Sequence, residues 1–208
     1  MPGRIHPVWK GKVGRLCLDF ANTADWHASG QPVEFLTSYA ELVGWGQHAS
    51  ILTEAEAQRL LEGAGRRPVE ASAVLARAIA LREALYWLLS ALSHGLEPQA
   101  EDLAIFNAEL SRVRAQSQIV LTAEGFSWGW LDDADALDRL LWPVVRDAAE
   151  LLTSEELHRV GQCLDDRCGW LFLDLSRNHS RRWCSMKGCG NRAKARRHYR
   201  RSQAPADR

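Results

Sequence analysis

Residues 163–201 read CLDDRCGWLFLDLSRNHSRRWCSMKGCGNRAKARRHYRR, and this stretch decides how the C-terminal end of the chain folds. It holds four of the five cysteines, as the pairs Cys163/Cys168 and Cys184/Cys189, with four residues inside each pair. Fifteen residues separate the pairs, enough for a hairpin that joins two metal-binding turns. The spacing predicts one tetrahedral site of four thiolates holding a structural zinc ion. Four protein ligands leave no position for a catalytic water.

Two alternatives remain open for these thiols, disulfides and iron. The first residues, Met1-Pro2-Gly3, show no signal-peptide pattern, so we expect a reducing, cytoplasmic location in which paired thiols more often hold metal. Iron also accepts four thiolates, but its sites favour a tighter spacing within each pair. The fifth cysteine, Cys17, is expected to be a core thiol without a metal role.

Charge is distributed unevenly along the chain. The sequence has 26 basic and 26 acidic residues, yet residues 177–201 include ten basic residues and no acidic one. Residues 1–176 hold 15 basic and 25 acidic groups, a net charge of −10. This separation is typical of a nucleic-acid-binding end, and we expect duplex DNA as the partner. The expected DNA contacts are Arg181, Arg182, Lys187, Arg192, Lys194, Arg196, Arg197, Arg200 and Arg201.

Residues 191–201, NRAKARRHYRR, predict the helix that would present these cations. Asn191 can cap the helix, and neither glycine nor proline interrupts it. Like charges at helical spacing destabilise an isolated helix by about a few tenths of a kcal/mol per pair, and a neighbouring polyanion would relieve that repulsion. We expect Ala195 and Tyr199 to dock the helix onto the zinc core. A solvated basic tail, or one that pairs with the acidic body, is the alternative.

The finger stretch follows the pattern CxxxxCxWxFxDxSxNxSRRWCSMxxCGNRxKxRRH, and it resembles the CGNR zinc finger, named for Cys189-Gly190-Asn191-Arg192. Residues 16–26, LCLDFANTADW, resemble the start of the ABATE domain, which precedes this finger in the family. Such proteins are regarded as stress-induced transcription regulators, with DNA binding inferred from their positive charge. The resemblance implies an ABATE-like domain over residues 1–157 and a CGNR-type finger over residues 158–208.

The hydrophobic pattern predicts an α+β fold, with a mainly helical N-terminal domain, a few antiparallel strands and a small C-terminal hairpin-and-helix finger. Gly95 is expected to end the longest helix, Pro143 to kink or split another, and residues 63–68 to form a break. The predicted helices of the N-terminal domain cover residues 39–47, 54–62, 69–94, 98–113 and 135–152. Ser38 and Thr53 begin capping-box patterns at the first two of these, and the acidic stretch at residues 132–135 is expected to cap the last. We expect the second half of the helix over 69–94 to be buried on most sides and Leu103 to face the core from the helix over 98–113. A further short helix is expected to start at Ser154 and lead to Cys163.

Three stretches are predicted as strands. Residues 14–22 alternate apolar and polar side chains, which is typical of a half-buried strand. Residues 118–130 predict a hairpin turning at Glu124-Gly125, whose aromatic stripe of Phe126, Trp128 and Trp130 has no interleaved basic residue and is therefore expected in the core rather than stacked on bases. In the finger, residues 170–174 and 181–184 are expected to pair as the arms of a hairpin.

Asp19, Asn22 and Trp26 are candidates for a ligand pocket in the N-terminal domain, because several polar groups follow an apolar stretch there. Asparagine and aspartate also cap turns, and that interpretation stays open. We expect this domain to sense a small-molecule effector or to form a homodimer. No uncharged apolar run reaches membrane-spanning length, so no membrane partner is expected.

The sequence lacks three motifs of common enzyme classes: GxGxxG after a strand, a Walker loop and HExxH. Residues 125–129, GFSWG, match GxSxG in letters, but they lie in the predicted hairpin and not at the strand-to-helix turn that this motif requires. We therefore expect a regulator rather than an enzyme. Two other classes remain as alternatives. The basic finger could bind an acidic protein instead of DNA, or the N-terminal domain could bind or convert a ligand with the finger as an accessory.

Overall fold

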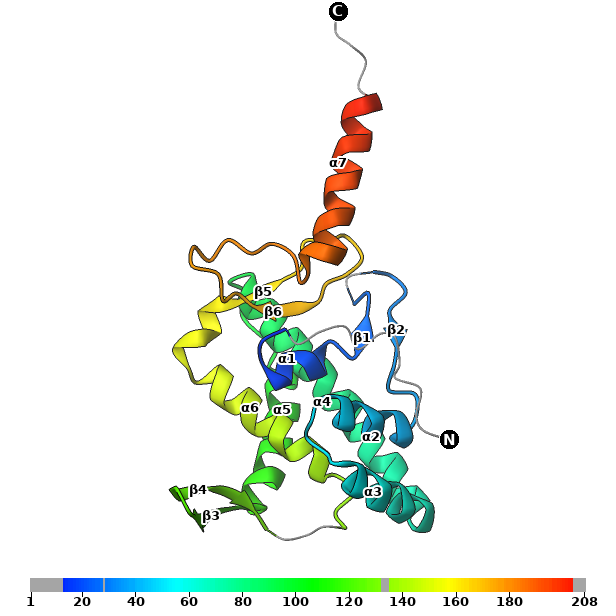
Figure 1. The fold of residues 1–208 in the computed structure, drawn as a ribbon, viewed down its shortest axis with the longest axis vertical. Helices are drawn as coiled ribbons and strands as arrows, with labels where there is room; N and C mark the ends of the chain where they lie inside the picture. Colours follow the sequence, from blue (N-terminus) through cyan, green and yellow to red (C-terminus); the bar gives the residue numbers. More distant parts are fainter. Residues whose placement is uncertain (1–12, 28, 132–134, 204–208) are drawn as a thin grey trace, which may run out of the picture.

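The computed structural model of this chain describes residues 13–27, 29–131 and 135–203. It confirms the α+β class, because the described residues are mainly helical and include three two-stranded antiparallel sheets. Figure 1 shows a helical body around α4 (Pro68–Ser93), with a small hairpin at one end and the helix α7 (Asn191–Gln203) projecting from the other. Among the described helices, none is long and apolar enough to cross a membrane.

Helix α4 forms the centre of the body. Its partners are α1 (Leu16–Ala21), α2 (Tyr39–His48), α3 (Glu54–Arg66), α5 (Ala100–Ala115) and β5 (Val160–Gln162). Surrounded in this way, its second half is buried on most sides, as predicted, with Leu85, Tyr86 and Leu89 in the core, whereas Trp87 is 49% exposed. Gly95 ends the helix at φ +68°, and the Leu96 N–H donates to the Ala91 carbonyl across 2.9 Å.

Helices α2 and α3 begin at capped ends, as their sequences predict. The Ser38 hydroxyl accepts from the Glu41 N–H, and Thr53 and Glu56 form a complete capping box. The predicted break at residues 63–68 is wrong in extent, because α3 continues to Arg66. Gly63 is buried, and a Cβ there would lie 3.2 Å from Leu137, so this glycine allows close packing rather than a turn.

The predicted strand over residues 14–22 is wrong, because residues Leu16–Ala21 form α1. Leu18 and Phe20 are buried, and so are the alternate residues Cys17 and Ala21. The alternating pattern in the sequence therefore did not correspond to one buried and one exposed face. Two carboxylates fix the local turn: Asp19 accepts from the Val13 N–H, and Asp147 accepts from the Cys17 N–H, each at 2.8 Å. The contact with the distant residue Asp147 overrides the strand preference of so short a segment.

Helices α5 and α6 (Trp142–Leu152) complete the body. Helix α5 begins at Ala100, after Gln99, rather than at Pro98, and Leu103 is exposed, so its predicted core position is wrong. A 3-10 turn precedes α6, and Pro143 lies in the first turn of that helix, which confirms that the proline splits the predicted segment. The α-helix begins at Trp142 rather than at the predicted residue 135, and of the acidic stretch expected to cap it, residues 132–134 lie outside the described residues.

The predicted hairpin is confirmed as β3 (Ser117–Thr122) paired with β4 (Gly125–Trp130). The prediction that its aromatic stripe lies in the core is wrong for two of its three members, since Phe126 is 80% exposed and Trp128 is 60% exposed. Only Trp130, at the base, packs on the core, with its ring 5.7 Å from that of Trp142. The hairpin extends beyond the helices, so its outer part meets no other element.

The finger begins with a strand pair that differs from the predicted one. Strand β6 (Leu171–Leu173) pairs with β5, which follows a 3-10 turn at Glu155–Arg159, and not with residues 181–184. The Asp174 carboxylate accepts hydrogen bonds from the N–H groups of Ser176 and Arg181. A loop held by this side chain, and not a second strand paired with β6, therefore leads to the second pair of cysteines. All three residues of β6 are buried in the core of the body. The third sheet joins β1 (Ala24–Asp25) to β2 (Val33–Glu34).

Candidate metal centre and basic helix

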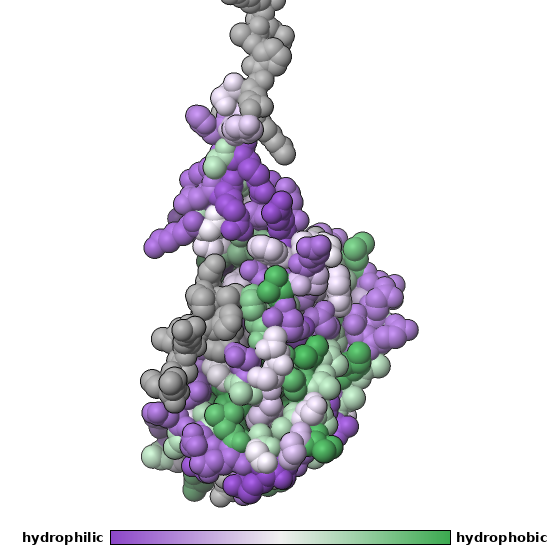
Figure 2. Space-filling model, turned by 90° about the vertical axis from the view of Figure 1, so that its right-hand side faces the viewer, coloured by the Kyte–Doolittle hydropathy of each residue, from purple (hydrophilic) through white to green (hydrophobic). Residues whose placement is uncertain are grey.

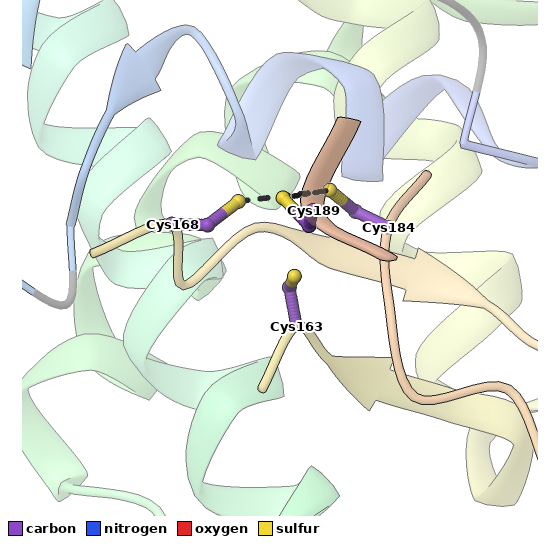
Figure 3. A group of neighbouring side chains, drawn as sticks. All are labelled: Cys163, Cys168, Cys184 and Cys189. Carbon is purple, nitrogen blue, oxygen red and sulfur yellow. Dashed lines mark hydrogen bonds between the residues drawn. The ribbon is translucent and has the colours of Figure 1, made fainter. Parts of the chain in front are cut away.

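The four cysteines of the finger converge on one point (Figure 3). Their sulfurs all lie within 4.8 Å of one another, and the Cys184 sulfur is 3.6 Å from those of Cys168 and Cys189. A tetrahedral zinc site with Zn–S bonds of about 2.3 Å places its sulfurs about 3.8 Å apart. A disulfide requires about 2.05 Å, and all five cysteines are free. The arrangement therefore fits one metal ion and not two disulfides.

Two tight turns hold the sulfurs in place. Cys163 follows β5, and the Cys168 N–H donates to the Asp165 carbonyl at 2.9 Å, with Gly169 at φ +66° turning the chain into β6. On the second turn, the Ser185 hydroxyl accepts from the Gly188 N–H, which brings Cys189 back beside Cys184. Trp170 and Trp183 pack against the sulfurs. Three of the cysteines are buried, so the centre is closed, as a structural site should be.

The electrostatics of the four thiols also favour a cation. Hydrogen bonds from Cys168 and Cys184 lower the pKa of Cys163, while the same contacts to Cys163 raise the pKa of Cys168 and of Cys184. Sulfurs this close cannot all ionise on their own, because each thiolate opposes the next. A bound divalent cation removes that conflict, since a coordinating thiol is deprotonated. The donor set and the spacing thus support a structural zinc ion held by Cys163, Cys168, Cys184 and Cys189.

An acidic residue anchors the basic helix to this centre. Asp165 lies between the first two cysteines, its side chain is 2% exposed, and it accepts from Arg192 and Arg196, both at 3.1 Å. Arg192 also donates to the Cys189 sulfur at 3.0 Å. Sequence analysis missed this role, although an aspartate pair between two ligands of a basic finger is the signal that could have revealed it.

Arg181 lies inside the finger rather than on its surface. Its guanidinium donates to the backbone carbonyls of Leu173, Trp183 and Cys184, and stacks 4.4 Å above the Phe172 ring. These contacts tie the loop after β6 to the second metal-binding turn. Its neighbour Arg182 is exposed and lies 5.8 Å from the Trp183 ring.

Helix α7 leaves the body almost unsupported (Figure 1), and Figure 2 shows it as a hydrophilic stem above a mixed surface. The expected docking of the helix through Ala195 and Tyr199 is wrong, because both are exposed, Tyr199 by 63%. The ion pairs of Asp165 hold the first turns instead. Lys187, Lys194 and Arg197 are exposed. The side chains of Arg200 and Arg201 lie outside the described part of the chain.

The candidate pocket residues lie around the end of α1. Asn22 is buried and makes two hydrogen bonds of 2.9 Å with the backbone of Leu171, one to its carbonyl and one from its N–H. Asp19 accepts from the Val13 N–H, whereas Trp26 is 41% exposed at φ +59°. The hydrogen bonds of Asp19 and Asn22 are those of residues that hold backbone turns, and they join α1 to the finger strand β6.

The fold and site together define a helical protein that carries a C-terminal four-cysteine zinc finger. A family model for the ABATE domain, described as "Putative stress-induced transcription regulator", matches residues 14–155, and a model for the CGNR zinc finger matches residues 159–202. The chain therefore belongs to the ABATE family, with a CGNR finger at its C-terminal end. Neither description names an enzymatic activity. A comparison with curated proteins finds no match.

Proposed function

We propose that this protein is a DNA-binding transcription regulator whose zinc finger presents α7 to duplex DNA. In this proposal the N-terminal domain senses a ligand or joins two copies, and it has no catalytic role. The observation that carries the proposal is the projection of a cationic helix away from an acidic body, on a metal-held mount (Figure 1). A polyanion is the partner that such a helix fits, since phosphate neutralisation dominates DNA affinity.

The two sides of α7 have different roles in this proposal. Arg192 and Arg196, four residues apart, lie on the side anchored to Asp165. At 100° per residue, Lys194 and Arg197 lie on the opposite side, and position 201 continues their stripe. We assign the phosphate contacts to this outer stripe, with Arg182, Lys187 and Arg200 as flanking contacts. Arg181 is assigned a structural role, because its donors already bind backbone carbonyls.

The test measures binding of the zinc-loaded protein to a mixed-sequence duplex by fluorescence anisotropy over a series of salt concentrations. For about 4–6 neutralised phosphates, log K should fall against log[salt] with a slope of roughly −4 to −5. The double variant Lys194→Ala/Arg197→Ala should weaken binding and reduce the steepness of that slope by about 2, because two phosphate contacts are lost.

The matched control removes two exposed cations from the body, as Arg59→Ala/Arg112→Ala. This control changes the net charge by the same amount as Lys194→Ala/Arg197→Ala, but it should leave the slope of log K against log[salt] unchanged. No binding at low salt, or equal effects of the two double variants, would contradict the proposal. Selection from a random duplex pool, with and without chelator, would then identify the preferred sequence and show whether it requires the metal-held finger.

A further inference from the structure

The hairpin β3–β4 exposes an apolar face at the end of the body opposite α7 (Figure 1). Cross-strand partners share a face, so Ile119 opposite Trp128 and Leu121 opposite Phe126 form one surface. These four side chains are exposed by 56%, 60%, 75% and 80%, in that order. A monomer rarely leaves such a set uncovered, and in a strand pair with open edges it is an aggregation hazard.

The hairpin is held rigidly at its base, so its exposed face is preformed. The Gln118 side chain donates to the Trp130 carbonyl at 2.7 Å, and the Leu131 N–H donates to the Gln116 carbonyl at 2.8 Å. Trp130 packs on Trp142, with Arg146 5.7 Å from its ring. A rigid apolar face loses little conformational entropy on binding, which favours its association with a partner.

We propose that this face is a homodimer interface, in which the hairpins of two copies pack face to face about a two-fold axis. Within residues 117–130 the only charged residue is Glu124, at the turn, so the face carries no charge that would select an acidic or basic partner. An uncharged apolar surface has no like charges to repel a copy of itself, which suits the self-complementary contact of an isologous interface. In the described sheet each strand has one edge without a neighbouring strand. The backbone groups along these edges can also pair with those of the second copy.

The area available agrees with a weak dimer. An aromatic side chain offers about 150–250 Å², so these four side chains expose on the order of 500 Å² in each copy. Two copies would bury about 1,000 Å², the lower limit for a specific interface. Beside the face lies a groove of about 540 Å³ between α5 and α6. Leu110, Val113, Ala149 and Trp128 give it an apolar part that can receive an apolar side chain of the partner, and Arg114, Arg146 and Glu150 also line it.

The proposal is tested on the full zinc-loaded chain without DNA, so its outcome is independent of the proposed DNA binding. Analytical ultracentrifugation over a concentration series into the high micromolar range should show a monomer–dimer equilibrium. Phe126→Asp should raise the dimer dissociation constant by at least about tenfold. The control Ser127→Asp places the same charge one residue away on the opposite face and should leave the constant unchanged. Far-UV circular dichroism checks that each variant is folded.

Two further measurements locate the contact. A photo-crosslinking phenylalanine analogue at position 126 should join to residues 117–130 or to the α5–α6 groove of the second copy. The dimer should also persist in high salt, because its interface is apolar. A monomer at every concentration, a dimer that dissociates in salt, crosslinks to the finger, or equal effects of Phe126→Asp and Ser127→Asp would each overturn the proposal.

Discussion

At the scale of single residues, Asp165 anchors the basic helix α7 to the metal centre. Its buried carboxylate accepts from two arginines of α7, one of which also reaches a metal-binding sulfur. A buried charge must be paired, and removing its partner leaves an uncompensated group. Asp165 therefore fixes the direction of α7 relative to the zinc centre, and through it the direction in which the outer cations point.

Asp165→Asn should weaken the finger while keeping its four metal ligands. The amide is nearly the same size but cannot balance two guanidinium groups, so we expect a loss of about 1–3 kcal/mol in the stability of the finger. Competition for zinc with a chromophoric chelator measures this loss as weaker metal retention. The neighbouring Asp166 is 75% exposed, and Asp166→Asn should change stability by no more than about 0.5 kcal/mol. Equal losses in the two variants would refute the anchoring role.

At the scale of secondary-structure elements, one side chain at the end of α1 hydrogen-bonds that helix to β6. Asn22 hydrogen-bonds both backbone groups of Leu171, a residue that is fully buried from solvent. Asn22→Ala should lower the free energy of unfolding by about 2–4 kcal/mol, because two buried backbone groups lose their partner. Denaturant unfolding followed by circular dichroism measures the change. Asn178→Ala, in an exposed loop, is the control and should have little effect; a similar loss there would contradict the explanation.

The elements that sequence analysis predicted well are those whose signals are local. Capping at Ser38 and Thr53, the glycine end of α4 and the proline split before α6 each depend on neighbouring residues alone. The failures depend on distant contacts. Helix α1 is only six residues long and depends on the distant residue Asp147. The glycine in α3 faces Leu137, and Phe126 and Trp128 are exposed because the described helices cover only the base of the hairpin. Periodicity cannot report any of these.

In the metal centre and the basic helix, too, the local features were predictable from the sequence and those that depend on distant contacts were not. The four thiols were predictable, because two short loops bring each pair together and the spacing is visible in the sequence. The contact of α7 with Asp165 was not, since it depends on the angle at which the helix leaves the second metal-binding turn. That angle also reversed the expectation for Ala195 and Tyr199, which face solvent, while Arg192 and Arg196 face the finger.

At the scale of the whole molecule, the finger and the body share one core. Leu171, Phe172 and Leu173 are buried among the side chains of the helical body, although they lie between the two pairs of metal ligands. The zinc centre above them is a separate small cluster. In the described part of the chain, α7 contacts the second metal-binding turn and, through Arg192 and Arg196, the acidic residues Asp165 and Asp166 of the first. The metal should therefore control the outer half of the finger, while the strand pair β5–β6 depends on the body.

Cys184→Ser tests this division. The variant should lose its stoichiometric zinc, because a hydroxyl replaces one of four thiolates. Hydrogen exchange should then increase in both metal-binding turns and throughout α7, whereas β6 and α4 should keep their protection, since hydrophobic contacts hold them. Cys17→Ala is the matched control: Cys17 lies in the core of the body, so the change should lower the thermal midpoint and leave zinc content unchanged. If loss of zinc from Cys184→Ser unfolded the helical body together with α7, the metal would be a folding requirement for the whole molecule, and the separate roles assigned to the two clusters would be wrong.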